Sequence, residues 1–356
     1  MIRYVPFLKL KQNEIMSIKE LENGLIEKIT PFFDYAKRKN ITEKDFIITA
    51  AKLAKALKRH AQNLSEVYLD NYDIESNFQV SGEHNYLHLL STFNEFSVIP
   101  VVSIDRSTEH NQAVSYAKDN AIVTTNILAI RLTPEDFQDF DLVEEDIEEE
   151  LDDIIEKFEA VDLIIDCRVC KNNNPVEYSK TISSFIPKFC DKYHTRRIIL
   201  TGSSIPASIK EITGVESTTD TPRVELDIYN RVVNLLNEKL PITLGDYCTV
   251  SPNYSDIDIP PGAMQNITAP KIIYTYDGHH HIIRGGALRT HKLGHGQYKF
   301  LLQQLLAQPF FRGEGFSSGD TYLAEKSRGE GKNATPTTMV KPLCNSHISY
   351  MCKNYV

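Results

Sequence analysis

The stretch VPFLKLKQNE, residues 5–14, decides between two fold classes. Its first four residues are apolar or proline and are typical of a short buried strand. Lys9 and Lys11 follow two positions apart, so they share one side of an extended chain. A helix is predicted to begin directly afterwards, and no glycine separates it from the strand. Because a doubly wound sheet normally has a glycine-rich phosphate turn at this point, the stretch favours a barrel.

Seven further β-type segments follow, with amphipathic helical stretches between them. Continuous apolar strands that alternate with helices indicate parallel strands covered on their outer side. Eight such strands over about 240 residues match the size of a (β/α)8 barrel, with a doubly wound sheet as the alternative. The predicted strands are residues 4–9, 29–35, 66–71, 97–103, 126–132, 161–167, 196–202 and 241–247.

The alternation changes after the eighth strand. Residues 271–284 predict a β-hairpin that turns at Asp277-Gly278 and lies outside the closed sheet. Residues 296–308 predict the helix due after strand eight, and a glycine-rich tail with scattered aromatic residues follows. We therefore predict a TIM-like α/β barrel over residues 1–308, including the hairpin. Residues 309–356 are expected to form a C-terminal extension that packs on the barrel and is not an independent domain.

Composition limits the function. The net charge is −9, and its acidic concentration near residues 143–158 has apolar residues at helical spacing, which predicts a solvated amphipathic helix. Non-specific binding of duplex DNA needs a basic surface and is not expected. No run of about 18 apolar residues predicts a membrane span, and no secretion signal precedes the first strand. We expect a cytoplasmic protein with reduced thiols, including the lone CxxC of Cys167 and Cys170.

Charged residues at the strand ends supply the candidate site. In a barrel of this kind the carboxyl ends of all eight strands meet at one mouth, where the chemistry lies. A charge that directly follows a buried strand is costly without a partner, which predicts a network around a polar ligand. The predicted catalytic residues are Asp70, Asp166 and Asp246. The predicted ligand-binding residues are Lys9, Lys11, Asp34, Arg131 and Arg168.

Cofactors are left open by the motifs. A lysine on the first strand also occurs in pyridoxal-phosphate barrels, but no phosphate-cradling glycine loop follows a strand. Several strand-end aspartates could hold a divalent metal, yet no HxH, HxD or HExxH set supports one. The histidines at 279–281 alternate faces on a strand and so cannot all bind one ion. We therefore assign neither a metal nor a cofactor.

Several short motifs together resemble those of the phage beta-protein family. They are YVPFLKLKQNEIMSIKEL and KITPFFD at the start, VDLIIDC in the middle, and later Gly245-Asp246-Tyr247, Gly319-Asp320 and His347-Ile348. The tail departs from the family pattern, because it has no tryptophan and Ser346 stands where a second histidine is common. The resemblance covers nearly the whole chain. It implies a barrel from a phage or anti-phage defence context, without implying a reaction.

Two functions are compatible with these observations. The first is an enzyme that acts on a phosphorylated or otherwise anionic small molecule, such as a nucleotide, in the barrel mouth. The second is a non-catalytic ligand sensor or scaffold subunit of a phage-defence complex. In the second case the tail would contact a protein partner or a second copy of the chain. The sequence does not separate the two.

Overall fold

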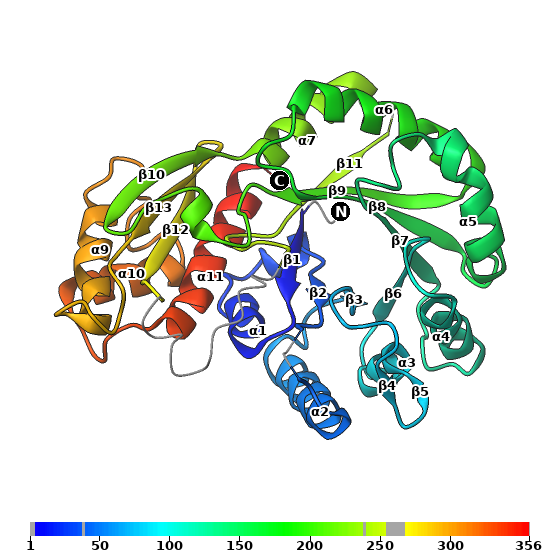
Figure 1. Cartoon of the computed structure of the whole chain (residues 1–356), viewed down its shortest axis with the longest axis horizontal. Coiled ribbons are helices and arrows are strands. Elements are labelled where there is room, and N and C mark those ends of the chain that lie inside the picture. Colours follow the sequence, from blue (N-terminus) through cyan, green and yellow to red (C-terminus); the bar gives the residue numbers. More distant parts are fainter. Residues whose placement is uncertain (1–3, 38–39, 238–239, 254–267, 356) are drawn as a thin grey trace.

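The computed structural model describes residues 4–37, 40–237, 240–253 and 268–355. Its centre is a closed barrel in which every pair of neighbouring strands is parallel, as predicted (Figure 1). The spatial order of the strands is β1-β11-β9-β8-β7-β6-β3-β2. Their bounds are β1 Tyr4–Lys9, β2 Phe32–Asp34, β3 Val67–Asp70, β6 Val98–Val102, β7 Ile127–Leu132, β8 Ala160–Val169, β9 Thr195–Ser203 and β11 Ile242–Asp246.

Each strand is buried on both faces, and alternate residues belong to two separate cores. Val5 and Phe7 of β1 point into the barrel, where they share an interior cluster with Phe32 and Tyr68. Their neighbour Leu8 instead packs outward under the helices. This period of two explains why the strands are apolar throughout, and it fixes which residue of each strand end faces the mouth.

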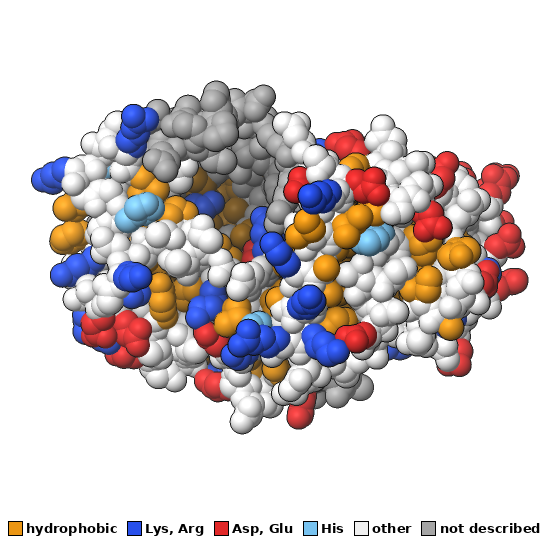
Figure 2. Space-filling view, turned by 90° about the horizontal axis from the view of Figure 1, so that it is seen from below, with side chains coloured by type: hydrophobic (Ala, Val, Ile, Leu, Met, Phe, Trp, Pro, Cys, Tyr) orange, Lys and Arg blue, Asp and Glu red, His pale blue; other side chains and the backbone are white. Residues whose placement is uncertain are grey.

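Helices cover the outside of the barrel in the usual alternation. The acidic helix α5 buries only its apolar stripe, and Figure 2 shows acidic side chains gathered at the end of the molecule where α5 lies. No helix among the described residues is long and apolar enough to cross a membrane. The helix bounds are α1 Gln12–Lys19, α2 Glu43–His60, α3 Asn85–Thr92, α4 Thr108–Asp119, α5 Phe140–Ile155, α6 Pro175–Lys192 and α7 Val224–Leu236.

A second, antiparallel sheet lies beside the barrel. Strands β12 (Lys271–Tyr276) and β13 (His279–Arg284) form the predicted hairpin, and Asp277 and Gly278 both have positive φ in its turn. A third strand, β10 (Ser217–Pro222), pairs with β13. Strand β10 was not predicted, because its residues, STTDTP, are polar and offer no apolar run. A two-residue pair, β4 (Gln79–Val80) and β5 (Glu83–His84), lies between β3 and α3.

The C-terminal extension is ordered and packs on both sheets. Residues 296–308 were expected to form the helix that covers the barrel after strand eight, but this expectation was wrong. Helix α9 (Gln297–Leu306) instead packs with α10 (Ser318–Arg328) on the hairpin in a separate apolar core. Helix α11 (Pro336–Asn354) lies beside α1 instead, where the Asn345 side chain donates to Ser17 O over 2.9 Å. The last helix of the chain, α11, therefore takes the place beside the barrel that was expected for the helix after strand eight.

Candidate functional site

The mouth of the barrel is a layer of polar residues above the apolar interior. These residues stand two positions after interior apolar residues, so the period of two turns them inward as well. The layer brings together most of the predicted site residues. They are Lys9, Asp34, Asp70, Arg131 and Asp166, joined by Tyr247, which the sequence analysis did not select; we call these six residues the mouth network.

Arg131 lies at the centre of the mouth network and is 1% exposed. Its Nη1 donates to Asp70 Oδ2 over 2.6 Å, and its Nη2 donates to Asp166 Oδ2 over 2.6 Å and to Tyr247 Oη over 2.8 Å. Tyr247 in turn donates to Asp166 Oδ2 over 2.5 Å. Burial alone would raise the pKa of Asp166, but Arg131 and Arg168 outweigh it and hold that pKa below its usual value.

Tyr72, in the loop after β3, lies among three guanidinium groups at the mouth. The Cζ atoms of Arg106, Arg131 and Arg168 lie 4.4, 4.5 and 4.2 Å from the centre of its ring. Cation–π attraction of this kind is strongest where the groups are desolvated. Arg106 is also tied to the mouth network, because its Nη2 lies 2.9 Å from both oxygens of Asp70.

Arg168 differs from the other two arginines in its surroundings. Its Nη1 lies 3.8 Å from Asp166 Oδ2 and donates to Tyr247 Oη over 3.5 Å, and its Nη2 donates to Asn253 Oδ1 over 2.9 Å. Its backbone is left-handed with φ of 49°, where the pairing of β8 with β9 shifts register. A non-glycine residue costs about 1–2 kcal/mol in that conformation, and such strain gathers at functional sites.

Lys9 completes the mouth network from β1. Its Nζ donates to Asp34 Oδ2 over 3.0 Å, to Asp73 Oδ2 over 2.6 Å and to the carbonyl of Pro252 over 3.1 Å. Asp73 belongs to the same loop as Tyr72 and is 12% exposed. Burial, and then the neighbouring Asp34, raise the pKa of Asp73 above its usual value. Lys9 therefore meets an anion in the mouth, as predicted, and that anion is a pair of aspartates.

A polar cavity of about 370 Å³ opens beside the mouth network, between the loops that follow β3 and β6. Tyr72, Asp73 and Arg106 line it. A cavity of this size accommodates part of a small molecule. Asp73, which binds Lys9, and Arg106, which binds Asp70, therefore connect the mouth network to an open space at the carboxyl end of the barrel.

Two predicted site residues lie elsewhere. Lys11 is exposed at the start of α1, and with Lys9 it lines a different cavity of about 360 Å³ beneath α11. Asp246 points away from the mouth, because Gly245 takes the inward position on β11 and Tyr247 the next one. The expectation that Asp246 shares one cavity with Asp70 and Asp166 was wrong by one step of the strand alternation.

Asp246 instead sits in a buried cluster between the barrel and the extension. Its carboxylate accepts from Tyr4 Oη over 2.7 Å and from Arg223 Nη2 over 2.7 Å. Its two oxygens lie 2.9 and 3.0 Å from His347 Nε2 of α11. Burial would raise the pKa of Asp246, but His347 and Arg223 hold it well below the usual value. This carboxylate therefore joins three separate parts of the chain.

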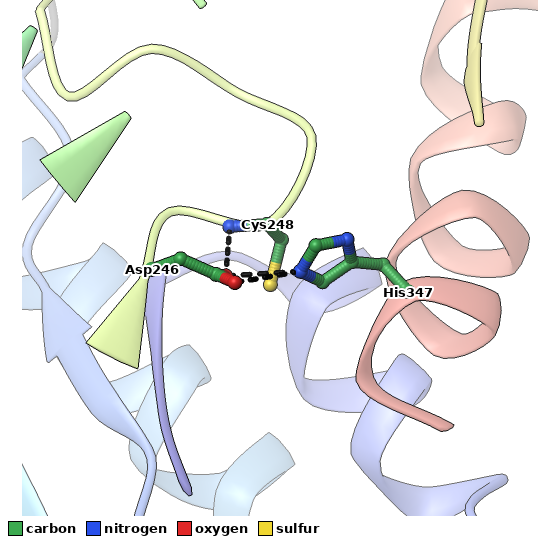
Figure 3. Close-up of side chains that lie close together, drawn as sticks. All are labelled: Asp246, Cys248 and His347. Carbon is green, nitrogen blue, oxygen red and sulfur yellow. Dashed lines mark hydrogen bonds and ion pairs between the residues drawn. The ribbon is translucent and has the colours of Figure 1, made fainter. Parts of the chain in front are cut away.

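The same cluster has the ligand types of a metal centre. One ligand atom from each of Asp246, Cys248 and His347 lies within 4.8 Å of the others, and all three side chains are buried (Figure 3). The sequence carries a signal for this cluster outside the paired-histidine motifs: Asp246 and Cys248 are two residues apart, and Cys344 and His347 three apart on one helix. Nothing in the spacing shows that these two pairs meet.

Other residues of the mouth were also missed. Tyr72 and Asp73 follow the end of β3 by two and three residues, and Arg106 follows β6 by four. Such loop residues could have been found by extending each strand end into its loop. Asp105 also follows β6 and pairs with Arg106, whose Nε lies 3.5 Å from its Oδ1.

Comparisons with known proteins place the chain in a family. A search of curated proteins finds no match. Among solved structures, the 3-keto-D-glucoside 4-epimerase YcjR from E. coli is 9% identical, with 74% of this chain and 96% of that chain covered and a TM-score of 0.33. That score is too low to support an argument about function. The family model of the Beta protein matches residues 4–353, and the chain belongs to this family.

Proposed function

We propose that the barrel mouth binds a small anionic molecule, with a nucleotide as the expected class, and that the protein acts on it as an enzyme. The observation that carries this proposal is Arg168. It is held over Tyr72 at the mouth in a strained backbone conformation, and its Nη1 lies 3.8 Å from Asp166 Oδ2. A planar guanidinium that is only loosely paired suits a phosphate or carboxylate, which it can bind with two parallel hydrogen bonds.

The other arginines would have different roles. Arg131 is 1% exposed and already bound by Asp70 and Asp166, so it supplies fixed positive charge beneath the ligand. Arg106 lines the 370 Å³ cavity and would contact the ligand from the side. Asp70 and Asp166 were predicted to be catalytic. Both carboxylates are fully buried and occupied by Arg131, so we assign them to the positioning of the arginines.

Asp73 is the carboxylate best suited to proton transfer. It lines the cavity, it is partly exposed, and its pKa is raised by burial and then by Asp34. A general acid or base works best when its pKa approaches the working pH. We therefore propose Asp73 as the proton-transferring residue, with Tyr247 kept protonated by burial, which raises its pKa well above the usual value.

Calorimetric binding of nucleoside mono-, di- and triphosphates tests the proposal. The wild-type protein should bind one of these classes, and Arg168→Met should weaken that binding at least tenfold. Arg231→Met is the matched control, because Arg231 is exposed on α7 and pairs only with Asp227 over 2.9 Å among the contacts described. Absence of binding to all of them, or equal binding by Arg168→Met, would contradict the proposal. Asp73→Asn should keep binding and lose turnover.

A ligand sensor or scaffold subunit is the second candidate. It is favoured by the closure of the mouth network, in which Arg131 and both of its aspartates are fully buried. In that case Asp73→Asn would change no chemistry, and ligand binding would appear only as a shift in melting temperature. A cytoplasmic role in anti-phage defence is our proposal for either case. Its support is family membership, and plaque assays on cells that express wild-type or Arg168→Met protein would test it.

A further inference from the structure

We propose that Asp246, Cys248 and His347 bind a zinc ion that joins the barrel to helix α11. This site is separate from the mouth and independent of the function proposed there. The three residues supply oxygen, sulfur and nitrogen, which are the ligand atoms of protein zinc sites. They come from the end of β11, the loop after it and the last helix, and their ligand atoms lie within 4.8 Å of one another (Figure 3).

One of the two tautomers that the hydrogen bonds around His347 permit leaves the correct nitrogen for a metal. His347 Nδ1 lies 2.7 Å from Thr275 Oγ1, which in turn lies 3.1 Å from His280 Nδ1. In this tautomer His347 Nδ1 donates a hydrogen bond to Thr275 Oγ1, and the Thr275 hydroxyl donates a hydrogen bond to His280 Nδ1. The lone pair of His347 Nε2 then faces the Asp246 carboxylate. Two lone-pair groups at 2.9 Å repel each other unless a cation lies between them. Metal-binding histidines usually have this arrangement, with the other ring nitrogen donating to an oxygen.

The charges of the buried cluster also have room for a cation. Asp246 and Glu225 are two buried carboxylates, and the buried Arg223 between them is one guanidinium. With neutral histidines the cluster keeps one uncompensated negative charge, which is costly away from water and which either a protonated His347 or a metal cation would balance. With His347 neutral, a Zn²⁺ ion and the thiolate of Cys248 alone bring the total to zero, and a second thiolate from Cys344 would leave one negative charge. Arg223 and Tyr4 would then hold the carboxylate in place from outside the metal shell.

Cys344 would complete a four-ligand site only if its sulfur moved toward the cluster, because that sulfur is not among the ligand atoms that lie within 4.8 Å of one another. It precedes His347 by three residues on α11, so both side chains lie on one face of that helix. Zinc binding would displace the thiol protons, as it does at other cysteine sites. Four protein ligands with no open position are typical of a structural zinc site.

Zinc content provides the test. The protein is purified without chelators, dialysed against zinc chloride and then dialysed against buffer without zinc. It should retain one zinc per chain, measured by inductively coupled plasma mass spectrometry. Cys248→Ser and His347→Ala should each lower retained zinc at least tenfold. The matched control is Cys190→Ser, because Cys190 is a half-buried thiol on α6 outside the cluster and its variant should keep the metal.

A second measurement uses the wild-type protein and so tests the proposal even if those variants do not fold. Wild-type protein stripped by a chelator should develop a thiolate-to-cobalt absorption band when titrated with Co²⁺, and zinc should remove that band. The proposal is overturned if the wild-type protein retains no zinc after dialysis and gives no cobalt band. It is equally overturned if Cys248 and Cys344 are joined in a disulfide in the folded, metal-free protein.

Discussion

Arg131 Nη2 and Asp166 Oδ2 lie 2.6 Å apart across the neighbouring strands β7 and β8, and neither side chain is more than 1% exposed. Such a pair gains little net stability over apolar residues of the same shape, but the loss of one partner leaves a buried charge. The pair therefore fixes the arrangement of the mouth. Removing one partner destabilises the fold by more than the intact pair stabilises it relative to apolar residues.

Replacing Arg131 with methionine should destabilise the fold by about 3–5 kcal/mol, because Asp70 and Asp166 would both lose their buried cation. Urea denaturation followed by circular dichroism measures this free energy of unfolding. Arg231→Met, at an exposed pair on α7, is the control and should unfold like the wild type. A loss below about 1 kcal/mol in Arg131→Met would show that the mouth relaxes around the two carboxylates.

Acid should weaken the fold through Asp166. Its pKa is lowered in the folded state, because Arg131 and Arg168 outweigh burial, while an unfolded aspartate has a pKa of about 3.9. The stabilising contribution is therefore present above about pH 3.9 and is lost as the pH falls through the folded pKa. The free energy of unfolding, measured from pH 6 downward, should fall less steeply in Asp166→Asn than in the wild type. If the free energy of unfolding fell equally steeply with pH in both proteins, Asp166 would not contribute to the acid sensitivity.

Replacing Lys9 with methionine should leave Asp34 and Asp73 facing each other without the ammonium group between them. We expect a loss of about 3 kcal/mol at pH 7 and a smaller loss at pH 5, where Asp73, whose pKa is raised by burial, takes up a proton more easily. Chemical denaturation at both pH values measures the difference. Lys58→Met is the control, since Lys58 pairs with Glu95 on the surface. An equal loss at both pH values would point to packing instead of charge.

The crossing of α10 and α11 should not tolerate a side chain at Gly319. A Cβ there would lie 2.8 Å from the backbone nitrogen of Ser346 and still closer to the carbonyl oxygen of Pro342, so the helices must separate. Gly319→Ala should destabilise the protein by at least about 2 kcal/mol and speed proteolysis of the extension. Gly315→Ala is the control, because the space around Gly315 is open. Similar melting temperatures for the two variants would show that the crossing is loose.

The barrel could be predicted from the sequence because its signal is repeated: each strand is a short apolar run, and a helix follows each. The site was harder, because strand alternation turns on single residues. At β11 the inward positions belong to Gly245 and Tyr247, which no apolar run reveals, so Asp246 was assigned to the wrong side. The contact of Asp246 with His347 joins residues 101 positions apart, and no periodicity connects them. Contacts of this kind depend on tertiary packing.

The position of α11 beside α1 has a consequence for synthesis. Asn345 binds Ser17, which emerges from the ribosome 328 residues earlier. Strand β1 likewise has no β11 to pair with until residues 242–246 have been synthesised. Contacts between such distant residues slow folding, and the nascent chain meanwhile exposes apolar surface that is prone to aggregate. Translation that stalls before α11 would therefore release a barrel with an uncovered seam along α1, which is the kind of surface that chaperones bind.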